Sequence, residues 1–509
     1  MIAVSDAWKN VQHRFLLPES FIEIDCGITD DEAQDVATAT GTNEAVFSTA
    51  SSVVGSSAMA RYATNELNLW ALDGTRTILP SSGAYANAGY VSNVESTGSV
   101  KLSFPEIRAN AISGVTITWS NKYGEYPKIF TVTGKNGEDV VSEITVTDNR
   151  EVVSAVSIPL ENYDSITISV HDWNIPNRRA RIEKIVIGHM LTFKKGDLIS
   201  FTHEQDGDLL SGKIPKYSIE FTLDNSDGRW DPNNPSGMAQ YLSERQKLVV
   251  RYGLDVDGTT EWIKAGTFYL SEWSAPPNGL EARFVARDVF EFMLNEELLI
   301  SRFDTLSGWI SLATNNLPVG SSVVVDPSLE NLSAEYSASY TTGDVSTDAE
   351  IVQKCANAAC CILRYDRDGV LYIEKFNGTA VDYRIPLSLS YSYPEITLSK
   401  PLKEVSVDYG DETPYILSVA VDGAQQTLSN DFIQNETNAK VVSAWVRDVL
   451  KTRKTVSGEF RADPRLDLYD VVQVEDRYGK LLTIAVTNIK YTFSGAFRGS
   501  FVGRILEEG

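Results

Sequence analysis

The sequence has little cysteine, histidine and proline, and it lacks long apolar runs. Its 509 residues include four cysteines, four histidines and 18 prolines. The cysteines are too few for a disulfide scaffold and no histidine stands near them at zinc-ligand spacing, so we expect reduced thiols and no metal site. No stretch reaches about 18 consecutive apolar residues, and MIAVSDAWKN is not an export signal. We therefore expect synthesis in the cytoplasm and no stable membrane insertion.

Basic residues are also in deficit. The chain has 45 Lys and Arg against 69 Asp and Glu, a net charge of -24. A surface of this sign repels phosphate groups, which argues against specific nucleic-acid binding and against an anionic membrane as partner. Two explanations stay open: acidity for solubility, or an acidic wall along which DNA slides without sticking.

Local catalytic motifs are missing from the sequence as well. It contains no His-Glu-x-x-His, no Gly-x-Ser-x-Gly and no phosphate-binding glycine loop, and His203-Glu204 is followed by Gln205 and Asp206. We expect no enzyme and no cofactor. A glycosidase needs only a pair of carboxylates, however, and 69 acidic residues do not exclude one.

Short runs that alternate apolar and polar residues fill most of the chain, separated by Gly, Asn and Asp turns. This pattern predicts a mainly β, multidomain fold. We expect a segment of unsettled structure at 1–95, a jelly-roll-like β-sandwich at 96–188, a small β-barrel at 189–300, an α+β module at 301–435, and a helix with a second small β-barrel at 436–509. Two β domains flanking an α+β module suggest an ancient duplication, although no fixed-period repeat is visible.

Two helices stand out within this β pattern. Thr347 and Glu350 form a capping box ahead of an apolar face, which predicts a helix over 348–362 that packs on the hairpin at 371–373. A second apolar face predicts a helix from Thr437 to about Lys451.

The loop DNSDGRWDPNNPSG (224–237) is dense in Asp, Asn, Gly and Pro. Clustered carboxylates with a turn glycine suit calcium, but an EF-hand frame that starts at Asp224 places Pro235 where a bidentate Glu is needed. The favoured explanation is a surface loop whose Asp and Asn side chains cap their own backbone.

Aromatic and amide side chains gather around two turns of the predicted sandwich. Aromatic faces beside amides and guanidinium groups suit stacking on sugar rings. Trp119 lies within an alternating strand and is expected in the core, whereas Trp173 precedes a turn and is the expected stacking ring. The candidate glycan-binding residues are Trp173, Tyr123, Tyr126, Asn174, Asn177 and Arg178.

Several phrases together resemble a known family. They are KIPKYSIEFTLDNSDGRWDPNNPSGMAQYLSERQKLVVRYGL (213–254), WIKAGTFYLSEW (262–273), ARDVFEFM (286–293), DPRLDLYDVVQVED (463–476) and IKYTFSGAFRGSFVGR (489–504). In this order they are similar to tail-tip or baseplate hub proteins, the tail-associated protein family of long-tailed phages and prophages of Gram-positive bacteria. The phrases ISGVTITWSNKYGEYPKIFTVTG (112–134) and SITISVHDWNIPNRRARIEKIVIG (165–188) resemble a carbohydrate-binding sandwich.

The resemblance implies a virion structural protein in the tail tip, made in the host cytoplasm and released by lysis. It implies a homotrimer whose two small β domains per subunit face a sixfold tail tube, with distal tail proteins and tip or fibre proteins as further partners and with DNA passing through the ring. Because the sequence ends at Gly509, we expect no fibre or peptidase extension. Two alternatives stay open: an adhesin that binds host glycans through the 96–188 sandwich, and a cell-wall-degrading tail enzyme.

Overall fold

The computed structural model describes residues 2–506 except 15–18, 46–47, 49, 55–88, 110, 121–122, 235–237, 243, 276–278, 294–300, 316, 319–320, 331, 339–346 and 410–412. The chain divides into two compact units. The sandwich domain is Cys26–Leu191, and the large domain comprises Met1–Asp25 and Thr192–Gly509. The expected fold class is confirmed, since the chain is mainly β and multidomain. None of the helices described here is long and apolar enough to cross a membrane.

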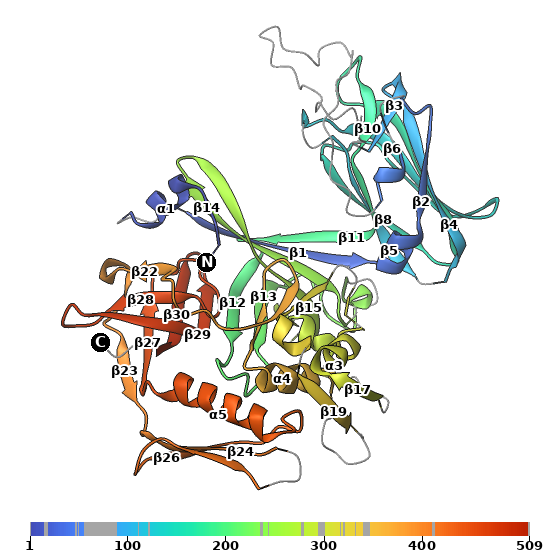
Figure 1. The fold of residues 1–509 in the computed structure, drawn as a ribbon. Coiled ribbons are helices and arrows are strands. Elements are labelled where there is room, and N and C mark those ends of the chain that lie inside the picture. Colours follow the sequence, from blue (N-terminus) through green and yellow to red (C-terminus); the bar gives the residue numbers. More distant parts are fainter. Residues whose placement is uncertain are drawn as a thin grey trace. The chain divides into compact units, whose positions relative to one another are not determined.

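Two antiparallel sheets make up most of the sandwich domain (Figure 1). One has the strand order β2-β4-β9-β6-β7, the other β11-β5-β8, and β3 pairs with β10. Their side chains alternate between core and solvent, most regularly in β8. The elements are α2 (Asp31–Val36), β2 (Thr38–Thr42), η1 (Ala50–Ser52), β3 (Tyr90–Glu95), β4 (Gly98–Arg108), β5 (Ile112–Thr118), β6 (Pro127–Asn136), β7 (Asp139–Val146), β8 (Val153–Leu160), β9 (Tyr163–Trp173), β10 (Arg179–Ile182) and β11 (Lys184–Lys194).

The domain takes in β2 and β3, which precede the start expected at residue 96. The apolar core lies between the two sheets and includes Val132 and Ile168 from one and Ile117 and Ile185 from the other. This core holds the sandwich together by removing apolar surface from water.

The large domain contains two five-stranded antiparallel sheets, which we call the first and second repeat. The first has the order β12-β13-β16-β15-β14 and the second the order β23-β27-β30-β29-β28 (Figure 1). In each, the last three strands in sequence form a meander and its final strand pairs with the second strand of the repeat. The strands are β12 (Leu198–Asp206), β13 (Lys216–Asp224), β14 (Lys247–Val256), β15 (Thr259–Ser274) and β16 (Glu281–Arg287), then β23 (Glu395–Leu398), β27 (Lys454–Phe460), β28 (Val471–Glu475), β29 (Leu481–Phe493) and β30 (Phe497–Ile505).

Backbone details fix which residues of the repeats correspond. Just before β14 and just before β28, Arg245 and Tyr469 have positive φ angles of 65° and 68°. Arg245 N donates to Leu270 O at 2.7 Å, and Tyr469 N donates to Val486 O at 2.8 Å. A bulge follows Leu270 in β15 and Val486 in β29, each opposite the final strand of its repeat. Leu270 therefore corresponds to Val486.

The same alignment reveals a sequence match. It superposes Phe284, Val285, Ala286 and Arg287 in β16 on Phe501, Val502, Gly503 and Arg504 in β30. The duplication expected from the pattern of β domains thus extends to the order, register and part of the sequence of the strands.

Within the described residues each repeat is an open sheet rather than the closed barrel expected. Three of the four outer strands find partners outside their own repeat instead: β14 is followed in the sheet by β1 (Ser20–Thr29), β12 pairs with β29, and β28 pairs with β22 (Tyr383–Ile385). Among the described residues β23 has no such partner. Edge pairing satisfies the backbone groups that barrel closure would otherwise satisfy.

The α+β module connects the repeats. Its helix α4 (Asp348–Ala358) begins at the expected cap, where Thr347 Oγ1 accepts from Glu350 N at 3.3 Å, and it shares an apolar core with Leu371 and Ile373 as expected. It ends before the expected residue 362, because Cys360 turns into the left-handed region at φ 56°. The second expected helix is α5 (Glu436–Leu450).

The remaining elements complete the large domain. They are α1 (Asp6–Gln12), η3 (Met238–Tyr241), η4 (Val289–Phe292), β17 (Ser301–Thr305), α3 (Leu306–Ala313), β18 (Ser322–Val325), η5 (Pro327–Glu330), β19 (Ser333–Ala338), β20 (Ile362–Tyr365), β21 (Val370–Glu374), β22 (Tyr383–Ile385), η7 (Leu387–Leu389), β24 (Leu402–Val407), β25 (Tyr415–Ser418) and β26 (Ala424–Leu428).

Candidate functional site: the junction of the two repeats

The two repeats are joined strand to strand. β12 of the first repeat pairs antiparallel with the C-terminal half of β29, from Phe201 opposite Phe493 to Asp206 opposite Asn488. The N-terminal half of the same edge of β29 pairs with β28. One long strand therefore serves both its own repeat and the neighbouring one.

A buried aromatic cluster lies at this junction. His203 of β12 is 1% exposed, its Nδ1 lies 2.7 Å from the Tyr252 hydroxyl, and its ring meets Phe268 edge to face at 5.3 Å between centroids. The ring of Tyr491 in β29 packs against the rings of His203 and Tyr252, at 6.1 and 6.2 Å between centroids. Burial lowers the pKa of His203 to about 3, so its imidazole is neutral at pH 7.

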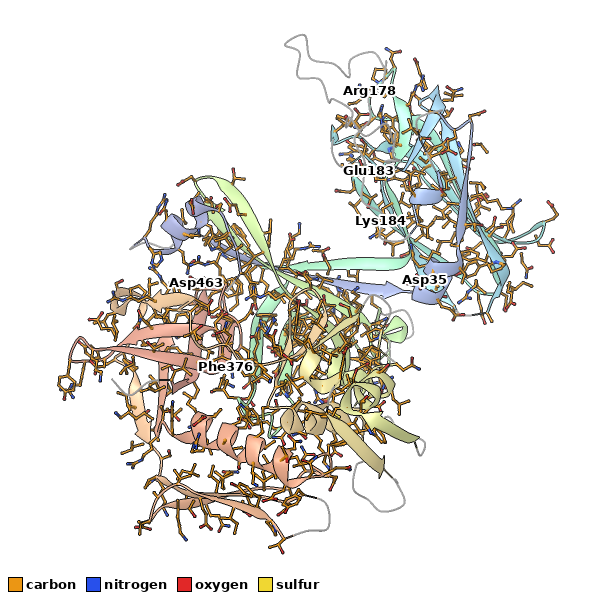
Figure 2. All side chains as sticks on the ribbon, in the orientation of Figure 1. Asp35, Arg178, Glu183, Lys184, Phe376 and Asp463 are labelled. Atoms are coloured by element: carbon orange, nitrogen blue, oxygen red, sulfur yellow. The ribbon has the colours of Figure 1, made fainter. Side chains whose placement is uncertain are left out.

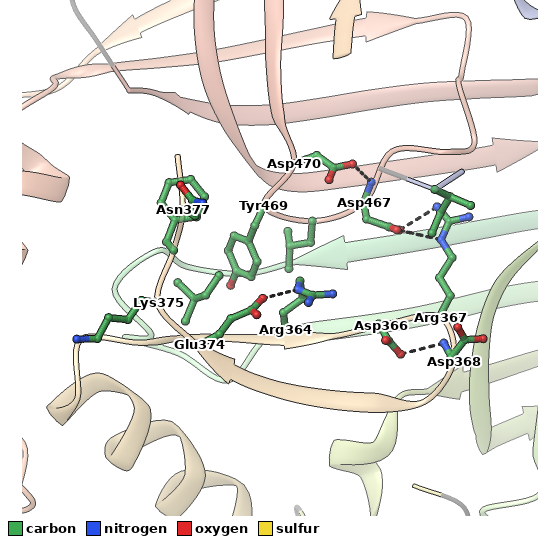
Figure 3. A pocket seen from close by; sticks show the side chains of 14 residues that line it. Arg364, Asp366, Arg367, Asp368, Glu374, Lys375, Asn377, Asp467, Tyr469 and Asp470 are labelled. Atoms are coloured by element: carbon green, nitrogen blue, oxygen red, sulfur yellow. Dashed lines mark hydrogen bonds and ion pairs between the residues drawn. The ribbon is translucent and has the colours of Figure 1, made fainter. Parts of the chain in front are cut away.

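Arg367 reaches the junction from the turn between β20 and β21. Its guanidinium donates to both carboxylate oxygens of Asp467, at 2.9 and 3.1 Å (Figure 3). It also donates to the backbone oxygens of Pro464, Leu466 and Lys264 at 2.8 to 3.1 Å. Lys264 belongs to the first repeat, and the other three precede β28 of the second. One buried side chain thus links the two repeats and the module between them.

Gln205 of β12 completes this polar network. Its amide donates to Asp467 Oδ1 at 3.1 Å and its oxygen accepts from Leu468 N at 2.8 Å. These bonds satisfy the buried Arg367 guanidinium and Gln205 amide, which favours one register of β12 on β29.

A cavity of about 430 Å³ lies beside the network. Two pairs of charged groups on its walls are bonded to one another, Arg364 to Glu374 at 2.8 Å and Arg367 to Asp467 (Figure 3). Burial raises the pKa of Asp470 to about 6, and this carboxylate accepts from Asp467 N at 2.9 Å. These contacts position backbone segments around the junction.

Of the glycan-binding residues expected in the sandwich domain, Trp173 and Arg178 are buried and not at the surface. Trp173 is 2% exposed, so its ring offers no free face to a sugar, and the stacking role expected for it does not fit the structure. The turn after Trp173 is anchored to the residue before β6: Asn174 N donates to Tyr126 O at 3.0 Å, and Asn174 Oδ1 accepts from Tyr126 N at 3.2 Å. Tyr123 and Tyr126 are partly exposed and Asn177 is exposed. Glycan binding at this end of the sandwich stays a prediction.

A buried carboxylate that the sequence did not single out organises these residues. Glu125 accepts from the Trp173 indole at 3.0 Å and pairs with Arg178 at 3.1 Å and Arg181 at 3.2 Å. Arg178, expected at the binding surface, is therefore buried as well (labelled in Figure 2). The available signal was the charge of Arg181 between the apolar residues Ala180 and Ile182, all three of them buried.

The structure also bears on Trp119 and on the loop at 224–237. Trp119 lies in the core, as expected, with its indole donating to Ser154 Oγ at 2.8 Å. In the 224–237 loop, Asp224, Asp227 and Asp231 each accept from the backbone two residues on, at 2.8 to 3.1 Å. These Asx turns match the explanation favoured for this loop.

Comparison with solved structures gives distant likenesses. The 43 kDa tail protein of prophage MuSo2 from Shewanella oneidensis has a TM-score of 0.41 and 12% identity, covering 62% of this chain and 94% of that one. A tail protein from Neisseria meningitidis has a TM-score of 0.44 and 11% identity, with coverage of 62% and 94%. A prophage tail protein from Listeria monocytogenes has a TM-score of 0.40 and 10% identity, with coverage of 62% and 90%. No protein-family model and no curated protein matches the chain.

Proposed function

We propose that the chain is a structural protein of a phage-type tail, acting as a homotrimeric hub in the tail tip. The observation that carries this proposal is the pair of repeats: two sheets of the same strand order in one chain, held edge to edge by β12 and β29. Three such chains supply six similar units, which fits the sixfold tail tube implied by the sequence resemblance.

The acidity of the chain fits the same role. A ring through which DNA passes benefits from walls that do not bind phosphate, and a chain with a net charge of -24 is suited to form them. The partners we propose are the tail tube on one side and distal tail, tip or fibre proteins on the other, with no catalytic step assigned to the chain.

Deletion of the gene from a phage or prophage that encodes the chain tests this function. We expect tailless or tipless particles, restored by a plasmid copy, and labelling of one tail end by an antibody against the chain. Normal, infective tails in the deletion strain would exclude the hub role.

A further inference from the structure

The chain contains a second strand and a second sheet edge that correspond to β12 and to the edge of β29, and these two do not pair with each other within the described residues. Leu270 corresponds to Val486, so the stretch 272–275 in and after β15 corresponds to 488–491 of β29. In β29 this stretch pairs with β12. In β15 the strand partners beyond Leu270 lie on the β16 edge, and no strand among the described residues covers the opposite edge.

The strand that corresponds to β12 is β23. Thr202 of β12 lies opposite Glu220 of β13, and Glu395 of β23 lies opposite Ser457 of β27. Glu220 and Ser457 correspond, because each faces the matching valine of the final strand, Val285 or Val502. Thr202 therefore corresponds to Glu395, and Glu204 to Thr397.

β23 ends the sheet of the described residues, and its outer edge carries apolar side chains. All four of its residues are exposed, and so are two tyrosines just before it. The exposed fractions are 50% for Tyr391, 55% for Tyr393, 43% for Ile396 and 57% for Leu398. Soluble proteins usually protect an open edge with lysine, proline or a bulge, so an exposed apolar edge marks a site of strand addition.

We propose that β23 of one copy of this chain pairs antiparallel with the free edge of β15 in a second copy. The register of β12 on β29, with Glu204 opposite Lys490, transfers to Thr397 opposite Ser274, and Leu398 then lies opposite Trp273. The partner is a second copy because the contact repeats one that the chain already makes within itself. The contact is head to tail, and its closure into a ring of three copies rests on the proposed function.

Engineered cysteines test this register. The double variant Ser274→Cys, Thr397→Cys should form disulfides between chains on mild oxidation, giving covalent dimers and trimers on a non-reducing gel, because opposed side chains on paired strands lie within disulfide reach. A mixture of the two single variants should give dimers alone. Of the native cysteines, Cys26, Cys355 and Cys361 are buried and Cys360 is partly exposed, and each single variant alone reports any background from Cys360.

The intrachain pair supplies the positive control. Glu204→Cys with Lys490→Cys occupies the corresponding positions of β12 and β29 and should form a disulfide within one chain. If this control closes while Ser274→Cys, Thr397→Cys stays monomeric at the same protein concentration, the proposed edge is wrong.

A charge on the edge gives a second readout. Leu398→Lys should weaken self-association by at least about tenfold in sedimentation, since a lysine on an edge strand opposes strand addition. Val421→Lys is the matched control, because Val421 is a 98% exposed valine outside β23. Equal association of both variants and the wild type would overturn the proposal.

These outcomes separate the strand pairing from the tail function. Cross-links in the purified chain together with normal tails in the deletion strain would leave the edge contact standing and remove the hub. If tails require the chain but the cross-link does not form, the hub role stands and the proposed edge contact is wrong.

Discussion

Arg367 stabilises the junction because one side chain satisfies acceptors from both repeats. Burying a guanidinium and a carboxylate costs desolvation energy, and the bonds to Asp467 and to three backbone oxygens offset it. Removing the guanidinium takes one donor from each of these acceptors in a site where Arg367 is only 6% exposed, although Asp467 still accepts from Gln205 and Leu466 O from the Tyr491 hydroxyl.

We expect Arg367→Met to lower the free energy of unfolding of the large domain by about 3–5 kcal/mol. Arg384→Met is the control: Arg384 bonds Glu475 at 3.0 Å with a side chain that is 54% exposed, and its loss should cost less than about 1 kcal/mol. Denaturant titration followed by tryptophan fluorescence measures both. Equal effects of the two substitutions would contradict the role given to Arg367.

His203 should make stability depend on pH. The folded chain keeps His203 neutral down to about pH 3, whereas the unfolded chain protonates it near 6.5. Acid therefore favours the unfolded state through this residue, by about 2 kcal/mol between pH 6.5 and pH 5. Asp288, whose pKa burial raises to about 7, acts in the opposite direction across this range, and so does Asp470, whose pKa burial raises to about 6; both are unchanged in the comparison that follows.

The comparison of wild type with His203→Gln isolates this effect, because Asp288 is present in both and cancels. We expect the wild type to lose about 2 kcal/mol more than the variant between pH 6.5 and pH 5. Parallel stability curves for the two proteins over this range would show that His203 titrates normally.

For single residues, the sequence pattern predicts a buried side chain more reliably within a strand than next to a turn. Trp119 was placed in the core by its position in an alternating strand. Trp173 was placed at the surface because Asn174, Pro176 and Asn177 follow it, but its burial depends on Glu125, which lies 48 residues away and accepts from its indole. Local composition carries no information on that contact.

Among the elements, α4 is specified locally. Its N-cap bond from Glu350 N to Thr347 Oγ1 satisfies a backbone donor that would otherwise lack a partner. We expect Thr347→Ala to lower the free energy of unfolding by about 0.5–2 kcal/mol and Thr347→Ser to preserve it, with self-association unchanged in both. Thermal melting measures the effect, and identical curves for Ala and Ser would remove the cap from the account.

Strand positions were predictable, but strand pairing was only partly so. Alternation located β13, β15 and β16, and the two β domains suggested a duplication. The pairing of β12 with β29 joins segments more than 280 residues apart, and nothing in either segment alone specifies the other. The matching Phe-Val-small-Arg segments of β16 and β30 were readable in the sequence, but their meaning depends on the register.

For the whole molecule, the strand pairing that joins the two repeats within one chain can also join repeats of different chains. Each repeat offers one strand and one edge for this pairing, and among the described residues one such strand, β12, and one such edge, on β29, are used. A head-to-tail contact of this kind closes into a ring if each step turns by the same fraction of a circle. We propose that three chains arrange their six repeats in one layer.

Cryo-electron microscopy of intact tails that contain the chain tests this claim most directly. The account predicts three copies at the tail tip, six repeats at one level around the channel, and β23 of each copy on the β15 edge of the next. A single copy, or repeats of one chain at different levels along the tail axis, would contradict it.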